Sequence, residues 1–326
     1  MSKDKFIEVK EDILKEIKKA ETIIIHRHQR PDPDAIGSQI GLAELIKRNL
    51  PDKKVFTAGE GSRTLNFLAK MNPPKKEDYK NALVLILDTA NRPRIDGDFA
   101  LTEGYKVIKI DHHPDEDQYG DIEWVDPSVS STSEMISDFW LTFSDDLLLS
   151  DEGARHLYAG IVGDTNRFLY PSTSSKTMQL AGKLMEKDFS HTDLNEEMNV
   201  MSPEIARLKA YLLENIKVSE NGVGSIILTK DLLEKFNMKD EDTHQIVSLP
   251  GSIAGVLNWG VFVEQENGGF RCRLRSKGPV INDIAKEHDG GGHPLASGAN
   301  AKNLEEIDEI LAKFEEKAKA FKKNHS

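Results

Sequence analysis

Short apolar runs that end in polar residues constrain the fold of this chain more than any other feature. Three runs have this form: Ile23–Ile25 before His28, Ala82–Leu87 before Asp88, and Val107–Ile110 before Asp111. An apolar run of about four to eight residues is typical of a buried strand. In open α/β sheets ligands bind at the carboxyl ends of the strands, so we expect three strand ends to deliver polar side chains to one crevice.

Helical patterns alternate with the expected strands. Residues 4–20 carry an apolar stripe at helical spacing, and a second helical pattern follows the first strand. A further strand is expected at Val55-Phe56, a short helix at Leu65–Leu68, and mostly helical structure over residues 131–188. Strands that alternate with helices predict a parallel sheet with covered faces.

A second, smaller domain is expected after a helical connector. The 326 residues leave room for about two domains of ~150 residues each. We assign a first domain to residues 1–190, a connector to 191–215 and a second domain to 216–326, which contains an Asn-Gly hairpin turn and a last helix that begins at Asn303. The expected fold class is α/β, with an N-terminal mostly parallel sheet flanked by helices and a smaller C-terminal α/β domain, with a cleft between them.

The composition excludes several classes of protein. The formal net charge of −12 opposes general binding of long nucleic acids, which needs clustered Lys and Arg, although a short phosphate-bearing ligand is compatible with it. The single cysteine, Cys272, excludes an internal disulfide and a multi-cysteine zinc site. The amino terminus lacks the pattern of a signal peptide, and no apolar stretch reaches the ~18 to 20 residues that span a bilayer. A cytoplasmic location is therefore expected.

The segment from His28 to Asp34 concentrates candidate metal ligands. His28, Asp32 and Asp34 flank two prolines that prevent the backbone from continuing as a helix. An ordinary acidic turn is the alternative, which is disfavoured by the strand before the segment and by Gly37-Ser38, which opens a helix after it. His26 lies on the same face of the strand as His28, so either could be the ligand. We choose His28 for its spacing to the carboxylates.

Three further sites supply carboxylates and imidazoles. Asp88 follows an apolar run, where burial of an ionised carboxylate is costly without a partner such as a metal ion. In Asp111-His112-His113, adjacent side chains at a strand end point in different directions, so one imidazole can bind a metal while its neighbour faces a substrate. Asp164 follows Gly163 at the end of a helical pattern. Taken alone, Asp88 and Asp164 could instead be helix-capping residues.

The types of ligand indicate a pair of hard divalent cations. Carboxylates with two imidazoles and no thiolate favour manganese or magnesium over structural zinc. The imidazoles favour manganese, with magnesium and cobalt as alternatives. Two ions ~3.5 to 4 Å apart can hold the attacking and leaving oxygens of an in-line displacement at phosphorus. The sequence therefore predicts a two-metal phosphoesterase.

A second candidate site lies in the C-terminal part of the chain. Four cations alternate with uncharged residues and would project from one face of a strand: Arg271, Arg273, Arg275 and Lys277. A charged edge strand that resists aggregation is the alternative. In the loop expected at Gly290-Gly291-Gly292-His293, backbone amides can approach an anion closely and the imidazole can contact a phosphate or a base, with a flexible surface loop as the alternative. The two features together predict a phosphate-binding domain.

These motifs resemble those of the DHH phosphoesterase superfamily with its DHH-associated C-terminal domain, over nearly the whole chain. The resemblance rests on five motifs: His28-x-x-x-Asp32-x-Asp34, Asp88, Asp111-His112-His113, Gly163-Asp164-Thr165 and Gly290-Gly291-Gly292-His293. The length, the two-domain layout and Leu274-Arg275-Ser276 are similar to the bacterial nanoRNase branch of that superfamily. Members of that branch degrade short oligoribonucleotides and also dephosphorylate 3′-phosphoadenosine 5′-phosphate (pAp).

The resemblance implies a role for each candidate residue. It implies one manganese ion at His28, Asp32 and Asp88, and a second at Asp34, Asp88, His112 and Asp164, with Asp88 as the bridge. Asp111 would orient the cluster and His113 would contact a phosphate, so that catalysis would depend on Asp88, Asp111, His112 and His113. The terminal phosphate or nucleotide would be bound by Arg275, Ser276, Gly290, Gly291, Gly292 and His293.

The activity implied by the resemblance is a manganese-dependent phosphodiesterase and phosphatase. It would degrade RNA of a few nucleotides to 5′-mononucleotides and remove the 3′-phosphate of pAp to give AMP. The expected partners are short single-stranded RNA and pAp, without long duplex nucleic acid or a membrane, and a homodimer is left open. One alternative is the manganese pyrophosphatase that shares the DHH triplet, which the glycine segment disfavours. The other is a nucleotide-binding sensor without turnover, which the complete set of ligands disfavours.

Overall fold

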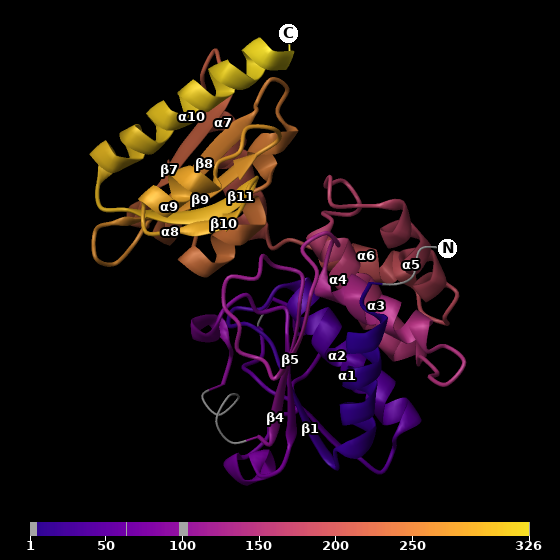
Figure 1. Ribbon diagram of the computed structural model, residues 1–326. Helices are drawn as coiled ribbons and strands as arrows, with labels where there is room; N and C mark the ends of the chain where they lie inside the picture. Colours follow the sequence, from indigo (N-terminus) through magenta and orange to yellow (C-terminus); the bar gives the residue numbers. More distant parts are fainter. Residues whose placement is uncertain (1–4, 63, 98–103, 326) are drawn as a thin grey trace. The chain divides into compact units, whose positions relative to one another are not determined.

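The computed structural model describes residues 5–62, 64–97 and 104–325 of the chain. It divides into two compact units, Met1–Asn199 and Val200–Ser326 (Figure 1). Each unit has its own sheet and its own hydrophobic core. The α/β fold class that the sequence predicts is confirmed.

The first unit is built on a five-stranded sheet in the order β2-β1-β3-β4-β5, and every neighbouring pair is parallel. Its strands are β1 Thr22–His26, β2 Lys54–Thr57, β3 Leu83–Leu87, β4 Lys106–Asp111 and β5 Ile122–Val125. The parallel sheet was expected, whereas β5 was not, because its short sequence mixes buried and half-buried residues and lacks a continuous apolar run.

Within the described residues of the first unit, the α-helices are α1 Ile7–Lys19, α2 Pro33–Asn49, α3 Thr132–Thr142, α4 Asp151–Asp164, α5 Ser175–Met185 and α6 His191–Asn199. Helices α1, α2 and α3 contact the strands directly, and α4 packs along α2. Along the chain, the short 3-10 helix η1 Lys76–Tyr79 lies in the connection from β2 to β3, and η2 Arg92–Arg94 lies in the connection from β3 to β4. The helix expected at Leu65–Leu68 is wrong, because this segment forms a bend and a turn. Four residues are too few to offset the cost of helix nucleation without caps.

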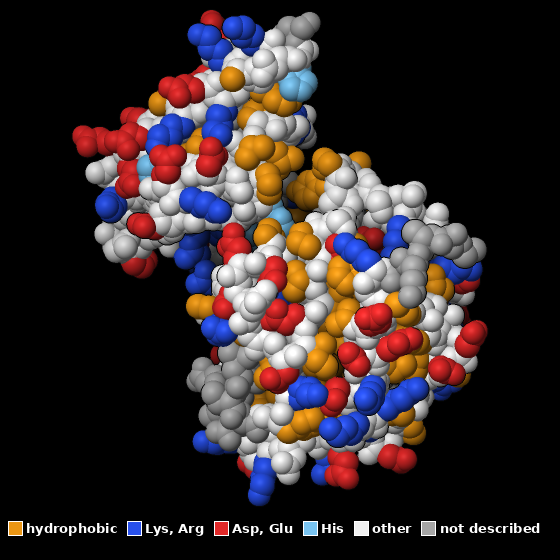
Figure 2. All heavy atoms as spheres, in the orientation of Figure 1, with side chains coloured by type: hydrophobic (Ala, Val, Ile, Leu, Met, Phe, Trp, Pro, Cys, Tyr) orange, Lys and Arg blue, Asp and Glu red, His pale blue; other side chains and the backbone are white. Residues whose placement is uncertain are grey.

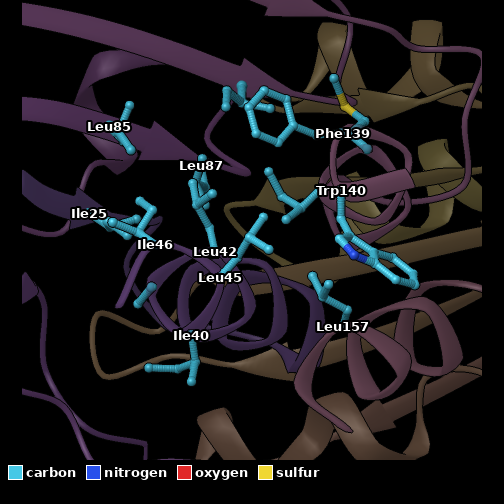
Figure 3. Packing of buried hydrophobic residues seen from close by; sticks show 14 of the residues in the cluster. Ile25, Ile40, Leu42, Leu45, Ile46, Leu85, Leu87, Phe139, Trp140 and Leu157 are labelled. Atoms are coloured by element: carbon cyan, nitrogen blue, oxygen red, sulfur yellow. The ribbon is translucent and has the colours of Figure 1, made fainter. Parts of the chain in front are cut away.

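The main core of the first unit lies between the sheet and the helices. Figure 3 shows Leu42 and Leu45 of α2 between strand residues such as Leu87 and helix residues such as Trp140 and Leu157. Helix α2 is buried along most of its length. Its first turn, which follows β1, is therefore held firmly in place at the carboxyl end of the sheet.

The second unit has a six-stranded mixed sheet in the order β10-β11-β9-β8-β7-β6, in which only β7 and β8 pair in parallel. Its strands are β6 Lys217–Val218, β7 Val223–Leu228, β8 Asn258–Glu264, β9 Phe270–Ser276, β10 Gly291–His293 and β11 Ala296–Ala301. Its helices are α7 Pro203–Asn215, α8 Lys230–Lys235, α9 Asn282–Glu287 and α10 Leu304–His325, with 3-10 helices η3 Asp240–Ile246 and η4 Leu249–Ser252.

Side-chain caps mark the starts of α7 and α10, and the start expected at Asn303 is confirmed. Helix α7 begins at Pro203, and the Ser202 hydroxyl accepts from the amide of Ile205 at 3.3 Å. Before α10, Asn303 Oδ1 accepts from the amide of Glu306 at 3.0 Å. Among the residues that the structure describes, no helix combines the length and the apolar character that a membrane crossing requires. Figure 2 shows Lys and Arg interspersed with Asp and Glu on the visible face of the first unit.

Candidate metal centre

One group of ligands lies at the end of β1. His28 Nε2 lies 3.6 Å from Asp32 Oδ2 and 3.5 Å from Asp88 Oδ2. Its other ring nitrogen, Nδ1, lies 2.8 Å from the carbonyl oxygen of Gln29, which can only accept, so Nδ1 carries a proton and Nε2 is the ligand atom of the neutral ring. Asp32 is the N-cap of α2, and its Oδ1 accepts from the amide of Ala35 at 2.9 Å. The turn therefore directs one imidazole and one carboxylate oxygen towards Asp88.

Asp88 stands between two groups of ligands. It follows β3 directly, is buried, and has a φ of 51°, in the left-handed region that residues other than glycine rarely adopt. Its Oδ2 faces His28, whereas its Oδ1 lies 3.4 Å from His112 Nε2. Backbone strain of this kind persists only where the surroundings enforce it, and it is common at functional sites. The conformation lets the two oxygens face different imidazoles, as a bridging carboxylate requires.

Asp34 lies in the first turn of α2 and faces the start of α3. Its Oδ2 accepts from the amide of Thr132 at 2.7 Å, and its Oδ1 accepts from the amide of Ser133 at 2.8 Å. The positive end of the helix dipole stabilises a negative charge at this position. Because each carboxylate oxygen has more than one lone pair, both oxygens keep one for a cation.

The side chains of the Asp111-His112-His113 triplet diverge, as expected at a strand end. Asp111 closes β4 and is fully buried, and its Oδ1 accepts from His113 Nδ1 at 2.8 Å. His112 turns its Nε2 towards Asp88 Oδ1 and towards Asp164 Oδ2, which lies 3.2 Å away. Asp111 thus contacts a histidine, whereas His112 contacts the carboxylates.

Asp164 reaches the cluster from the last turn of α4. The preceding residue, Gly163, packs against Pro33, since a Cβ atom at position 163 would meet Pro33 Cβ at 2.7 Å. A glycine here lets the end of α4 approach the bend that opens α2. Ligand atoms of Asp34, His112 and Asp164 consequently lie within 4.8 Å of one another.

The structure brings all the expected metal ligands close to one another. Three groups have their ligand atoms within 4.8 Å: His28 with Asp32 and Asp88, Asp34 with His112 and Asp164, and Asp88 with His112 and His113. His26 is directed elsewhere, because its Nδ1 donates to the carbonyl oxygen of Asp96 at 2.8 Å and its Nε2 accepts from the Tyr79 hydroxyl at 2.9 Å. His28 is therefore the histidine of this segment that faces the carboxylates.

The crowded charges shift the pKa values of these groups. Burial alone would lower the pKa of His28, but its hydrogen bonds with Asp32 and Asp88 override burial and raise the pKa to about 10. Burial raises the pKa of Asp164 to about 6. Burial, with the charges of Asp88 and Asp164, holds the pKa of Asp34 well above its usual range. Carboxylates gathered in this way resist ionisation together, and a cation among them would relieve the repulsion.

The geometry and the donor types fit divalent cations. Two ligands bound at ~2.1 Å in adjacent coordination positions lie ~3.0 to 3.4 Å apart. The contacts of His28 and His112 with the carboxylates, at 3.2 to 3.6 Å, are close to that spacing. Oδ2 of Asp111 is buried and has no hydrogen-bond partner among the described residues, which leaves an unsatisfied carboxylate oxygen beside the cluster. Oxygen and imidazole ligands without a thiolate suit manganese, magnesium or cobalt.

The start of α3 is a part of this centre that the sequence did not indicate. Thr132 and Ser133 are fully buried and reach Asp34 through their amides, and the Thr132 hydroxyl also donates to Asp88 Oδ1 at 3.3 Å. The sequence feature that points to this segment is the run of hydroxyl residues that begins at Ser130. Such a run, taken by itself, is typical of a helix cap. Ser131 does cap α3, by accepting from the amide of Glu134 at 3.0 Å.

In the second unit, the three arginines of the predicted stripe lie on one face of β9, as expected, whereas Lys277 lies just beyond the end of that strand and donates to the carbonyl oxygen of Gly251 at 2.8 Å. Two of its members are held by one carboxylate of η3, since Arg271 and Arg273 lie 2.6 and 3.1 Å from the oxygens of Asp240. Arg275 is opposite Ala296 of β11, which is itself opposite His293 of β10. Side chains of residues opposite one another point to the same face of a sheet, so Arg275 and His293 share a face.

Two expected substrate residues have surroundings that the sequence did not indicate. Ser276 alternates to the opposite face from Arg275, is buried, and donates to the carbonyl oxygen of Leu257 at 3.4 Å. The glycine segment is not an open loop, because Gly291–His293 forms β10 and pairs with β11. Gly290, just before it, lies so close to β11 that a Cβ atom would meet the carbonyl oxygen of Gly298 at 2.0 Å.

Family models cover most of both units. Residues 22–161 match the DHH family, N-terminal domain, and residues 224–320 match the DHHA1 domain. Over 298 residues the chain is 53% identical to a protein of Streptococcus mutans, spanning 91% of this chain and 95% of the relative. The chain belongs to the DHH family. The family resemblance drawn from the motifs is thereby confirmed.

The relatives carry names that describe hydrolases. The Streptococcus mutans protein is named probable bifunctional oligoribonuclease and PAP phosphatase NrnA. A Bacillus subtilis protein that is 44% identical, over 94% of this chain and 98% of its own length, is named bifunctional oligoribonuclease and PAP phosphatase NrnA. A solved structure of an exopolyphosphatase-related protein from Bacteroides fragilis is 28% identical, with a TM-score of 0.87 over 96% of this chain and 98% of the other. This DHH-family chain is a hydrolytic enzyme, and DHH-family phosphoesterases depend on metal ions.

Proposed function

We propose that this protein is a manganese-dependent two-metal phosphoesterase that degrades short oligoribonucleotides to 5′-mononucleotides and removes the 3′-phosphate of pAp to give AMP. The observation that carries the proposal is the convergence of His28, Asp88, His112 and Asp164 at one edge of the sheet. Relatives named oligoribonuclease and PAP phosphatase, which align over more than nine-tenths of this chain, supply the substrate class.

Each ion has its own set of residues in this proposal. The first would be held by His28, Asp32 and Asp88, and the second by Asp34, Asp88, His112 and Asp164. Bound divalent ions neutralise phosphate oxygens and lower the pKa of water, so that hydroxide is available at neutral pH. Manganese is preferred over magnesium because imidazoles are among the ligands.

Hydrogen bonds to the surrounding residues orient two imidazoles of the site. The Gln29 carbonyl oxygen accepts the Nδ1 proton of His28, so Nε2 is the nitrogen that would bind an ion once its own proton is displaced. Asp111 accepts from Nδ1 of His113 and orients that ring, and we propose that this imidazole contacts the substrate phosphate. A positioned donor at this point would stabilise the negative charge that develops on the phosphate.

We assign binding of the terminal phosphate or nucleotide of the substrate to residues of the second unit. Arg275 and His293 share a face of the sheet, which suits contact with a terminal phosphate and a nucleotide. Gly290, Gly291 and Gly292 would let backbone amides approach the same anion. The orientation of Ser276 suits support of the strand end better than direct contact with substrate. An end-phosphate grip selects short chains, because long chains are usually bound along extended basic or aromatic grooves.

Hydrolysis assays with matched substrates test this proposal. With manganese, we expect fast release of mononucleotides from a dinucleotide, slow release from a long single-stranded RNA, and release of phosphate from pAp. Equal rates on short and long RNA would contradict the length selection. Rapid hydrolysis of pyrophosphate without action on dinucleotides would replace the proposal by a pyrophosphatase. Binding of pAp without turnover would replace it by a sensor.

A further inference from the structure

Thr132, the first residue of α3, contacts two carboxylates that belong to different ligand groups. Its hydroxyl donates to Asp88 Oδ1 at 3.3 Å, and its amide donates to Asp34 Oδ2 at 2.7 Å. The residue is fully buried. Its hydroxyl is not needed to cap the helix, because Ser131 already accepts from the amide of Glu134.

We propose that Thr132 is a positioning residue of the metal centre, which sets the rotation of the Asp88 carboxylate so that its two oxygens face separate ions. This inference rests on the proposed function, since it assigns a task within the same two-metal site. Thr132 would not touch either ion or the substrate. It would act through Asp88, while its amide holds Asp34.

The need for such a residue follows from the other contacts of Asp88. The neighbours of its oxygens include the imidazoles of His28, His112 and His113, at 3.4 to 3.6 Å. Once ions are bound, the ligand nitrogens of His28 and His112 present lone pairs to the metal and can no longer donate to Asp88. A hydroxyl keeps its proton in both states. Thr132 therefore restrains Asp88 before and after the ions bind.

Rotation of the carboxylate is otherwise weakly restricted. The last torsion of an aspartate side chain, between its Cβ and carboxylate carbons, is broad and roughly two-fold, so local contacts decide its angle. Rotation of Asp88 about this bond would move Oδ1 and Oδ2 away from their separate imidazoles together. Loss of an outer hydrogen bond to a metal ligand typically weakens metal binding about 10- to 100-fold.

Three substitutions in the full chain separate this role from a purely structural one. Thr132→Val keeps the shape and the amide but removes the hydroxyl, whereas Thr132→Ser keeps the hydroxyl. Ser137→Ala is the matched control, because the Ser137 hydroxyl is buried in the same helix and donates to a backbone carbonyl oxygen, that of Ser133, at 2.7 Å. The readouts are the number and affinity of bound Mn²⁺ ions by calorimetry and the unfolding midpoint of the metal-free protein.

For Thr132→Val we expect at least one of the two Mn²⁺ dissociation constants to rise about tenfold or more, with Thr132→Ser and Ser137→Ala close to wild type. Wild-type affinity in Thr132→Val would overturn the inference, as would equal weakening in Thr132→Val and Ser137→Ala. If Thr132→Val does not fold, Thr132→Ala replaces it with the same expectation. Failure of the wild-type protein to bind two ions would instead contradict the proposed function itself.

Discussion

Addition of one methyl group where α2 meets α4 should impair the metal centre. At Gly37 the two helices touch: a Cβ atom there would lie 2.5 Å from the carbonyl oxygen of His156 and 2.9 Å from the amide nitrogen of Gly160. Both neighbours are backbone atoms, so neither can rotate away. Ordinary contact begins at 3.4 Å, so Gly37→Ala requires the helices to separate by about 0.9 Å.

The separation matters because each helix carries a metal ligand. Asp34 lies in the first turn of α2, and Asp164 closes α4. A misplacement of about 1 Å can lower catalysis about 100-fold, and overpacking of a core typically costs about 1–3 kcal/mol of folding free energy. We therefore expect Gly37→Ala to lose about 100-fold in kcat/KM on pAp and to unfold at lower urea concentration.

A second glycine in a helix provides the control. Gly182 lies in α5, and a Cβ atom there would meet nothing within 4 Å. Gly182→Ala should gain about 0.5–1 kcal/mol of stability through helix propensity and keep full activity. We would measure kcat/KM with saturating manganese, and unfolding in urea, for the wild-type protein, Gly37→Ala and Gly182→Ala. Full activity of Gly37→Ala would refute the view that the α2–α4 contact sets the spacing of the ligands.

Three further changes test other parts of the site. The pKa of Asp164 rises from 3.8 to about 6 in the metal-free protein, so its contribution to stability, complete below 3.8, is lost as the pH rises through 6. Because Mn²⁺ must displace the protons of Asp164 and His28, the rise in unfolding temperature caused by Mn²⁺ should be larger at about pH 8 than at about pH 5; an equal rise would argue against these ligands. Arg275→Ala should raise KM for pAp about tenfold or more through loss of a charge-assisted contact. Arg271→Ala should change KM little, because the Arg271 guanidinium is paired with Asp240. Steady-state kinetics measure both KM values, and a larger rise for Arg271→Ala than for Arg275→Ala would contradict the assignment. Lys109→Met removes a buried ammonium that donates to the carbonyl oxygen of Asp117 at 3.0 Å. Urea unfolding should therefore show a loss of about 1–3 kcal/mol in the free energy of unfolding. Unchanged stability would contradict the role of Lys109 in holding the segment after the DHH triplet.

The sequence predicted the features that depend on local pattern. Strands that are buried on both faces need continuous apolar runs, and the polar residues that end such runs must meet at one edge of a parallel sheet. His28, Asp88 and His112 were therefore expected to converge. The cap at Asn303 was readable from the sequence because a cap and its helix are adjacent in the chain.

The features that were missed depend on contacts between distant segments. Thr132 meets Asp34 across 98 residues, and nothing near Thr132 distinguishes it from an ordinary helix start. Asp240 neutralises two arginines of β9 from another element, so the stripe alone overstated the number of cations that can hold a phosphate. The glycines of residues 290–292 were expected to form a loop because glycine favours turns, but their lack of side chains also permits the close pairing with β11.

The position of manganese in crystals of this protein tests the central claim most directly. Anomalous scattering measured at the manganese edge should give two peaks about 3.5–4 Å apart, one on each side of the Asp88 carboxylate, with His28 beside one and Asp164 beside the other. A single peak, or peaks that leave Asp88 without a metal contact, would contradict the account.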